Sequence, residues 1–145
     1  MHWGYSVYYD SIASSLTIRI KHAPDKNIKN VLIAVDAGHG GENSGAAGNT
    51  SSKLEKKLTL EYATAFEKEL KKAGVKKIFM TRTKDTSLSM PERIRMLRDT
   101  APDLLISIHF NSSSVHTVKG TSTFYRHIGF RPLTQTILKR MMELG

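Results

Sequence analysis

The sequence predicts an α/β fold, with a mainly parallel central sheet flanked by helices and preceded by a short β segment from another module. A continuous apolar run, typical of a strand buried on both faces, occurs at residues 31–35, and another buried strand is expected at residues 104–108. Between them, apolar residues recur at every fourth position from Leu54 to Leu70, which indicates an amphipathic helix. Strands that alternate with helices in this way form mainly parallel sheets.

The first part of the chain has a different pattern. Apolar and polar residues alternate within residues 5–20 with the period of two that is typical of half-buried strands. Two strands alone cannot bury a core. We therefore interpret residues 1–27 as the tail of a preceding β module that ends in a linker at residues 24–27.

The remaining elements follow in chain order. A glycine-rich turn at residues 36–41 follows the first buried run, and the helix after it is expected to end at Gly74. Ser89 opens a second helix with a capping box, and this helix reaches about Asp99. Further expected elements are strands at residues 77–82, 104–108 and 121–125, and a last helix at residues 133–144.

Composition limits the function classes. The net charge of +9, from 22 Lys and Arg against 13 Asp and Glu, favours anionic partners such as nucleic acid, lipid head groups or a cell envelope rich in carboxylate and phosphate. The absence of cysteine excludes disulfides and Cys-ligated zinc, so a metal site would use His and carboxylates. No apolar run approaches the roughly 20 residues of a membrane span, and the opening residues lack a signal peptide pattern.

Three side chains are candidate metal ligands. His39 follows the first buried strand, and His109 follows the strand at residues 104–108. Because the carboxyl ends of parallel strands lie at one edge of a sheet, both imidazoles are expected in one crevice. Glu55, in the first turn of the intervening helix, can face the same crevice. Two imidazoles and one carboxylate are a known ligand set for catalytic zinc.

Each of these residues also has a structural interpretation. Ser52 and Glu55 fit a capping box, in which Glu55 would bond only a backbone N–H group. His39 fits an ordinary loop residue, in a turn whose glycines could cradle an anion. A single histidine after a strand, such as His109, is more often structural than a ligand. The pattern alone leaves these alternatives open.

Five motifs, in order and spacing, resemble the zinc-dependent N-acetylmuramoyl-L-alanine amidase family in its type 3 catalytic domain. They are residues 36–41 with 44–46, residues 55–60, Thr81-Arg82 with Asp85, Arg93, and residues 107–111. The resemblance implies that residues 28–145 are the N-terminal part of the catalytic domain, lacking its C-terminal strand and helix. It implies one zinc ion held by His39, Glu55 and His109. Asn111 is a candidate for positioning the substrate or the His109 loop, and it equally fits an ordinary turn residue at the end of a strand.

The implied activity is hydrolysis of the amide between N-acetylmuramic acid and L-alanine in bacterial peptidoglycan. A second functional glutamate of the family would lie beyond Gly145, so this stretch is expected to be weakly active or inactive. Glu42, beside the His39 turn, is the remaining acidic candidate for a catalytic role, whereas Glu143 belongs to the last helix and is rejected.

The expected partners are peptidoglycan and a cell-envelope activator protein, in the periplasm or outside the cell. The first alternative is a non-catalytic, zinc-containing peptidoglycan-binding module. The second is a basic nucleic-acid-binding domain, suggested by the charge. Nucleic acid is not expected, because few aromatic residues accompany the basic clusters and no nucleic-acid-binding signature is present.

Overall fold

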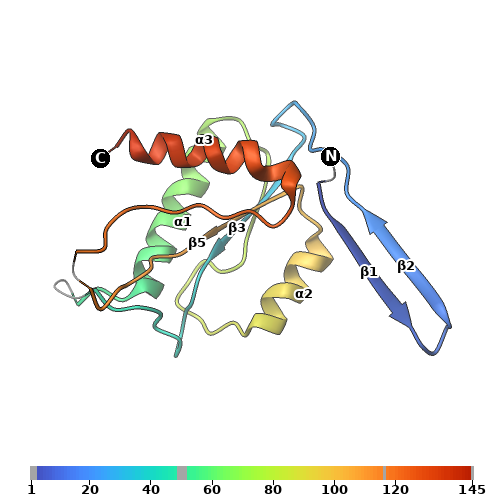
Figure 1. The fold of residues 1–145 in the computed structure, drawn as a ribbon, viewed down its shortest axis with the longest axis horizontal. Coiled ribbons are helices and arrows are strands. Elements are labelled where there is room, and N and C mark those ends of the chain that lie inside the picture. Colours follow the sequence, from blue (N-terminus) through green and yellow to red (C-terminus); the bar gives the residue numbers. More distant parts are fainter. Residues whose placement is uncertain (1–2, 49–51, 116, 145) are drawn as a thin grey trace. The chain divides into compact units, whose positions relative to one another are not determined.

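The computed structural model describes residues 3–48, 52–115 and 117–144 (Figure 1). The chain divides into two structural units. One unit, Pro24–Ser114, contains strands β3, β4 and β5 with helices α1 and α2. The other unit combines the segment up to Ala23 with the segment from Val115 onward, and it contains β1, β2, the 3-10 helix η1 and helix α3.

A three-stranded parallel sheet forms the centre of the first unit. Its strands are β3 (Leu32–Ala37), β4 (Lys77–Met80) and β5 (Leu104–Ile108), in the spatial order β4-β3-β5. All three strands lie where the sequence predicts them, within two residues at each end. The α/β class and the parallel sheet are therefore confirmed.

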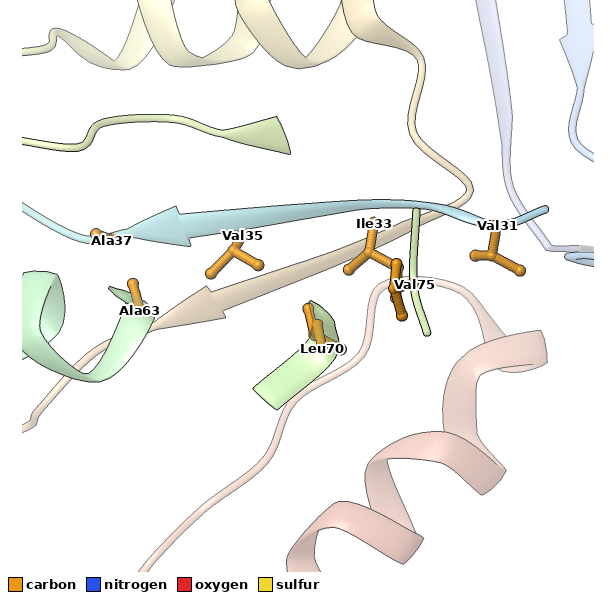
Figure 2. Close-up of a cluster of buried hydrophobic side chains, with 7 residues drawn as sticks. All are labelled: Val31, Ile33, Val35, Ala37, Ala63, Leu70 and Val75. Carbon is orange, nitrogen blue, oxygen red and sulfur yellow. The ribbon is translucent and has the colours of Figure 1, made fainter. Parts of the chain in front are cut away.

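The hydrophobic core lies between β3 and helix α1 (Glu55–Lys72). Alternate residues of a strand point to the same face, and β3 contributes Ile33, Val35 and Ala37 to this core. Helix α1 contributes Ala63 and Leu70, which are part of the same cluster in Figure 2. The helix is confirmed, but its buried face is shifted from the predicted repeat: Ala63 and Leu70 are buried, whereas Tyr62, a member of the repeat, is 55% exposed.

Helix α2 (Met90–Thr100) begins with the predicted capping box. The Ser89 side chain accepts a hydrogen bond from the backbone N–H of Glu92, and the Glu92 carboxylate accepts one from the N–H of Ser89. The helix ends at Ala101, whose φ of 47° is left-handed. One side chain of this helix, that of Arg93, is buried.

The N-terminal strands form an antiparallel hairpin. Strand β1 (Tyr5–Asp10) pairs with β2 (Ser15–Ile20), and Val7 lies opposite Ile18. Both strands are largely exposed, which agrees with the rule that two strands alone do not bury a core. The interpretation of residues 1–27 as the tail of a separate module, and the domain boundary near residue 28, stay predictions.

The predicted strand at residues 121–125 is wrong. The structure contains no strand in this segment, and Phe124 and Tyr125 are 83% and 45% exposed. An alternating pattern becomes a strand only when a neighbouring strand completes its hydrogen bonds, and the sheet of the described residues ends at β5. The last helix, α3 (Arg131–Met142), begins two residues earlier than predicted and follows η1 (Ile128–Phe130).

Candidate metal centre

Three segments of the first unit bring His39, Glu55 and His109 together. His39 lies in the turn after β3, Glu55 is the first residue of α1, and His109 follows β5. Each offers one potential ligand atom, and these atoms all lie within 4.8 Å of one another. In the part of the chain that the structure describes, this is the one group of three such side chains that could hold a metal ion.

The distances fit a zinc site. Oε1 of Glu55 lies 3.2 Å from Nε2 of His39 and 3.1 Å from Nδ1 of His109. Ligand atoms around tetrahedral zinc, with bonds of about 2.0–2.1 Å, are about 3.3 Å apart. The donors are two imidazoles and one carboxylate, the set found in catalytic zinc sites. The residues present therefore fit the metal that the sequence analysis expects.

Glu55 is not a capping residue. The N-cap of α1 is Leu54, and no side chain caps the helix, so the capping-box alternative with Ser52 is wrong. Instead the Glu55 carboxylate is 6% exposed, and its two oxygens accept hydrogen bonds of 2.8 Å from the backbone N–H groups of Ala46 and Phe110.

These contacts keep Glu55 ionised. Burial raises the pKa of the Glu55 carboxyl group, but the hydrogen bonds from Ala46 and Phe110 oppose it. Together with the side chains of His109 and His39 they outweigh burial and leave the pKa of Glu55 below its usual value. Glu55 is therefore a carboxylate near neutral pH, as a metal ligand must be.

The turn after β3 fixes the tautomer of His39. Oδ1 of Asn43 accepts a hydrogen bond from the backbone N–H of Gly45 at 3.2 Å, and it lies 2.9 Å from Nδ1 of His39. Because an amide oxygen only accepts, Nδ1 of His39 carries the proton and donates to Asn43. Nε2, the atom that faces Glu55, then has its lone pair available for a metal.

Two glycines leave room for the ligands. A Cβ atom at Gly38 would lie 2.3 Å from the imidazole of His109. A Cβ atom at Gly45, whose φ is +66°, would lie 2.7 Å from both the Glu55 carboxylate and the His39 ring. His39 itself has a φ of 60°, which is uncommon for a residue with a side chain. The glycine-rich turn is therefore shaped around the ligands.

Two buried arginines hold the backbone of this turn. Arg82 and Arg93 are 3% and 6% exposed. Arg82 donates to the carbonyls of Ala37 and Gly38, each at 2.9 Å, and Arg93 donates to the carbonyls of Ala37 and His39. Three consecutive carbonyl groups of the chain leading to His39 are thus held by guanidinium groups.

Asp36 anchors Arg93 in turn. Its carboxylate accepts hydrogen bonds from Arg93 at 2.5 Å and from the hydroxyls of Thr81 and Ser107 at 2.7 Å. Burial raises the pKa of Asp36, but the bonds from Ser107 and Thr81 and the charge of Arg93 outweigh it and hold the pKa below its usual value. A charged network therefore links strands β3 and β5 and helix α2 beneath the candidate site.

The other predicted site residues lie outside the cluster. Glu42 is exposed, and its backbone N–H donates to the Ser87 hydroxyl at 3.1 Å. Asn111 is exposed, two residues after His109. Glu143, which the sequence analysis rejects, lies at the end of α3 and pairs with Arg140. The roles of Glu42 and Asn111 stay predictions.

Sequence reasoning missed Asn43 as the partner of His39. Its signal was its position, four residues after a candidate ligand within the same glycine-rich turn. It also missed what Arg82 and Arg93 do, although both belong to the motifs noted above. Their contacts to backbone carbonyls have no signature in the sequence.

An α/β sheet with two imidazoles and a carboxylate at the carboxyl ends of its strands defines a protein with a candidate His2Glu metal site. The sequence model of one family, described as N-acetylmuramoyl-L-alanine amidase, matches residues 33–143. The chain belongs to this family of hydrolases.

Relatives agree with the family and the fold. The chain is 33% identical over 134 residues to the probable cell wall amidase LytH of Staphylococcus aureus, covering 91% of this chain and 44% of LytH. The catalytic domain of CwlV, an amidase from Bacillus (Paenibacillus) polymyxa, is 30% identical with a TM-score of 0.69, covering 75% of this chain and 61% of that one. The chain therefore spans less than two thirds of these relatives.

A third similarity concerns the fold alone. The CwlD amidase from Clostridioides difficile, solved in complex with the GerS lipoprotein, superposes with a TM-score of 0.71 at 24% identity. The match covers 79% of this chain and 66% of CwlD. Within the described ranges, no helix combines the length and the apolar character needed to cross a membrane.

Proposed function

We propose that this chain carries the zinc-binding part of an enzyme that hydrolyses the amide between N-acetylmuramic acid and L-alanine in peptidoglycan. The observation that carries the proposal is the convergence of His39, Glu55 and His109 from three segments of a chain that belongs to the amidase family. Such an enzyme acts on the cell wall, so we place it outside the cytoplasm, with peptidoglycan as its main partner and a cell-envelope activator protein as a second one.

We infer one zinc ion, bound by His39, Glu55 and His109. The distances of 3.1 and 3.2 Å and the ionised state of Glu55 support this ligand set. When bound, zinc supplies Lewis-acid chemistry for amide hydrolysis. Three protein ligands leave a further coordination position open, which is typical of catalytic rather than structural zinc.

The residues of the chain have separate tasks in this proposal. Asn43 keeps His39 in the tautomer that binds metal through Nε2, and the N–H groups of Ala46 and Phe110 keep Glu55 charged and in place. Asn111, exposed on the loop that carries His109, contacts the substrate. Glu42, exposed on the His39 turn, is the candidate for moving the proton to the leaving amine.

The test separates metal binding from hydrolysis. Zinc content is measured on wild-type protein and on His39→Ala, His109→Ala and Glu55→Gln, and stem-peptide release from purified peptidoglycan is followed by mass spectrometry. We expect about one zinc per wild-type molecule and markedly less in each variant. Wild-type zinc content in His39→Ala and His109→Ala would refute the ligand assignment.

A second candidate function is peptidoglycan binding without hydrolysis. It is favoured by one observation, namely that Glu55 is the only carboxylate in the metal-binding cluster of the described residues. A carboxylate that binds metal and accepts two N–H bonds is poorly placed to move protons as well. Co-sedimentation with insoluble peptidoglycan, without release of stem peptides under zinc-loaded conditions, would favour this candidate.

A further inference from the structure

An aromatic contact joins helix α1 to the loop after β5. The rings of Tyr62 and Phe110 meet edge to face, with centroids 5.0 Å apart and an interplanar angle of 69°. This is a favourable geometry for aromatic pairs. The Tyr62 side chain is nevertheless 55% exposed, and Phe110 is half-buried. The pair therefore lies at the surface and is not part of the main hydrophobic core.

Each ring belongs to the same segment as a candidate metal ligand. Tyr62 follows Glu55 by seven residues, about two turns, so both lie on one side of α1. Phe110 directly follows His109, and its backbone N–H donates to Oε1 of Glu55 at 2.8 Å. The same oxygen lies 3.1 Å from Nδ1 of His109.

The segment that follows His109 lacks regular structure. The imidazole of His109 is 47% exposed, although it is the ligand that the loop must hold in place. No helix or strand is formed by residues 109–115 or 117–127, within the part that the structure describes. Phe110 joins this loop to α1 twice, through its ring on Tyr62 and through its backbone N–H on Glu55.

We propose that Tyr62 is a positioning residue of the metal site. Its ring holds Phe110 against α1, and thereby keeps His109 and the Phe110 N–H group on the Glu55 carboxylate before a metal arrives. Without the ring, metal binding must also order the loop, and this cost lowers affinity. The inference rests on the proposed zinc ligands. It assigns a role to Tyr62, which acts through Phe110 and is not itself a zinc ligand.

The contact requires an aromatic ring and not a hydroxyl group. Tyr62→Phe should therefore behave as wild type, whereas Tyr62→Ala should bind zinc about 3- to 10-fold more weakly, the range expected for one aromatic pair. Phe110→Ala should have a similar effect. Because the two side chains act through one contact, the double variant should be little worse than either single variant.

The experiment is a double-mutant cycle on the 145-residue protein. Zinc affinity is measured by competition with a chelating dye for wild type, Tyr62→Ala, Phe110→Ala, the double variant and Tyr62→Phe. The matched control is Tyr8→Ala on the hairpin, a tyrosine with the same exposed fraction of 55%. The control should leave zinc affinity unchanged.

A second measurement needs no metal. Hydrogen exchange of the Phe110 amide, protected by its bond to Glu55, should accelerate about 3- to 10-fold in metal-free Tyr62→Ala and stay slow in Tyr62→Phe. If Tyr62→Ala does not fold, Tyr62→Leu replaces it in both measurements.

The outcomes separate the two proposals. A wild-type protein that binds no zinc would overturn the proposed function, and the exchange rates would then decide the role of Tyr62. Zinc binding by wild type with equal affinity in Tyr62→Ala, or unchanged exchange at Phe110, would overturn the positioning role alone. Weaker binding in Tyr62→Phe would also overturn it, because that variant keeps the ring.

Discussion

The imidazole of His109 lies directly against the backbone of Gly38. A Cβ atom at Gly38 would lie 2.3 Å from Cε1 of His109 and 2.5 Å from Nε2. The two residues come from the ends of neighbouring strands, and the backbone N–H of Gly38 donates to the carbonyl of Ile108 at 3.1 Å. The missing side chain at position 38 is therefore what allows His109 to approach Glu55.

Gly38→Ala should disrupt the metal site. The added methyl group meets a ring rather than the flexible end of a side chain, so His109 must move away from Glu55. We expect zinc affinity to fall at least about tenfold. The free energy of unfolding should fall by about 1–3 kcal/mol, the range for overpacking. Zinc titration and urea unfolding measure the two effects.

Gly74→Ala is the matched control for this change. Gly74 follows α1 with a φ of +90°, and the atom nearest to a Cβ there is 3.9 Å away. The substitution should lower stability through backbone strain while leaving zinc affinity as in wild type. Equal zinc affinity in Gly38→Ala and Gly74→Ala would contradict the role given to Gly38.

Asn43→Ala should weaken zinc binding without unfolding the protein. Asn43 is exposed, so little packing is lost, but Nδ1 of His39 loses the acceptor that fixes its tautomer. Removal of such a partner typically lowers metal affinity about 10- to 100-fold. Calorimetric zinc titration measures this, with Asn30→Ala as the control, because Asn30 is exposed and its side chain bonds Asp25 and none of the candidate ligands. A wild-type titration curve for Asn43→Ala would show that the tautomer is set in another way.

The convergence of the three ligands could be predicted from the sequence, whereas their supports could not. His39 and His109 follow the predicted strands at residues 31–35 and 104–108, and parallel strands place such residues at one edge of the sheet. Arg82 and Arg93 instead reach carbonyls of residues 37–39, more than 40 positions away, and only the folded chain shows those contacts. The strand predicted at residues 121–125 is wrong for a similar reason. Its alternation of apolar and polar residues does not reveal whether a neighbouring strand exists.

Asp36 should make stability depend on acid pH. Its pKa is lower in the folded protein than the value of about 3.9 in an unfolded chain. The folded state therefore gains stability above about pH 4, and this gain is lost as the pH falls through the lower, folded pKa. Urea unfolding between pH 2 and pH 7 should show this loss in wild type.

Asp36→Asn removes the acid-dependent part of the stability. It also leaves the buried guanidinium of Arg93 without its carboxylate partner. We expect a loss of about 3–5 kcal/mol at pH 7 and a flatter dependence of the unfolding free energy on pH. Asp99→Asn, at an exposed site on α2, is the control and should change neither quantity. A parallel pH dependence in Asp36→Asn and wild type would assign the acid sensitivity to other groups.

Stem-peptide release by the 145-residue protein should be slow even when zinc is bound. Both oxygens of Glu55 already accept N–H bonds, and the metal cluster of the described residues contains no other carboxylate. Loss of a positioned general acid or base costs about 10²–10⁴-fold in rate.

The catalytic domain of CwlV provides the benchmark, assayed on the same peptidoglycan at equal zinc occupancy. Glu42→Gln tests the remaining acidic candidate: if Glu42 moves the proton, this variant loses the residual release while its zinc content stays at the wild-type level. Release as fast as that of CwlV would refute the expectation of weak activity, and unchanged release in Glu42→Gln would eliminate Glu42 as the group that moves the proton.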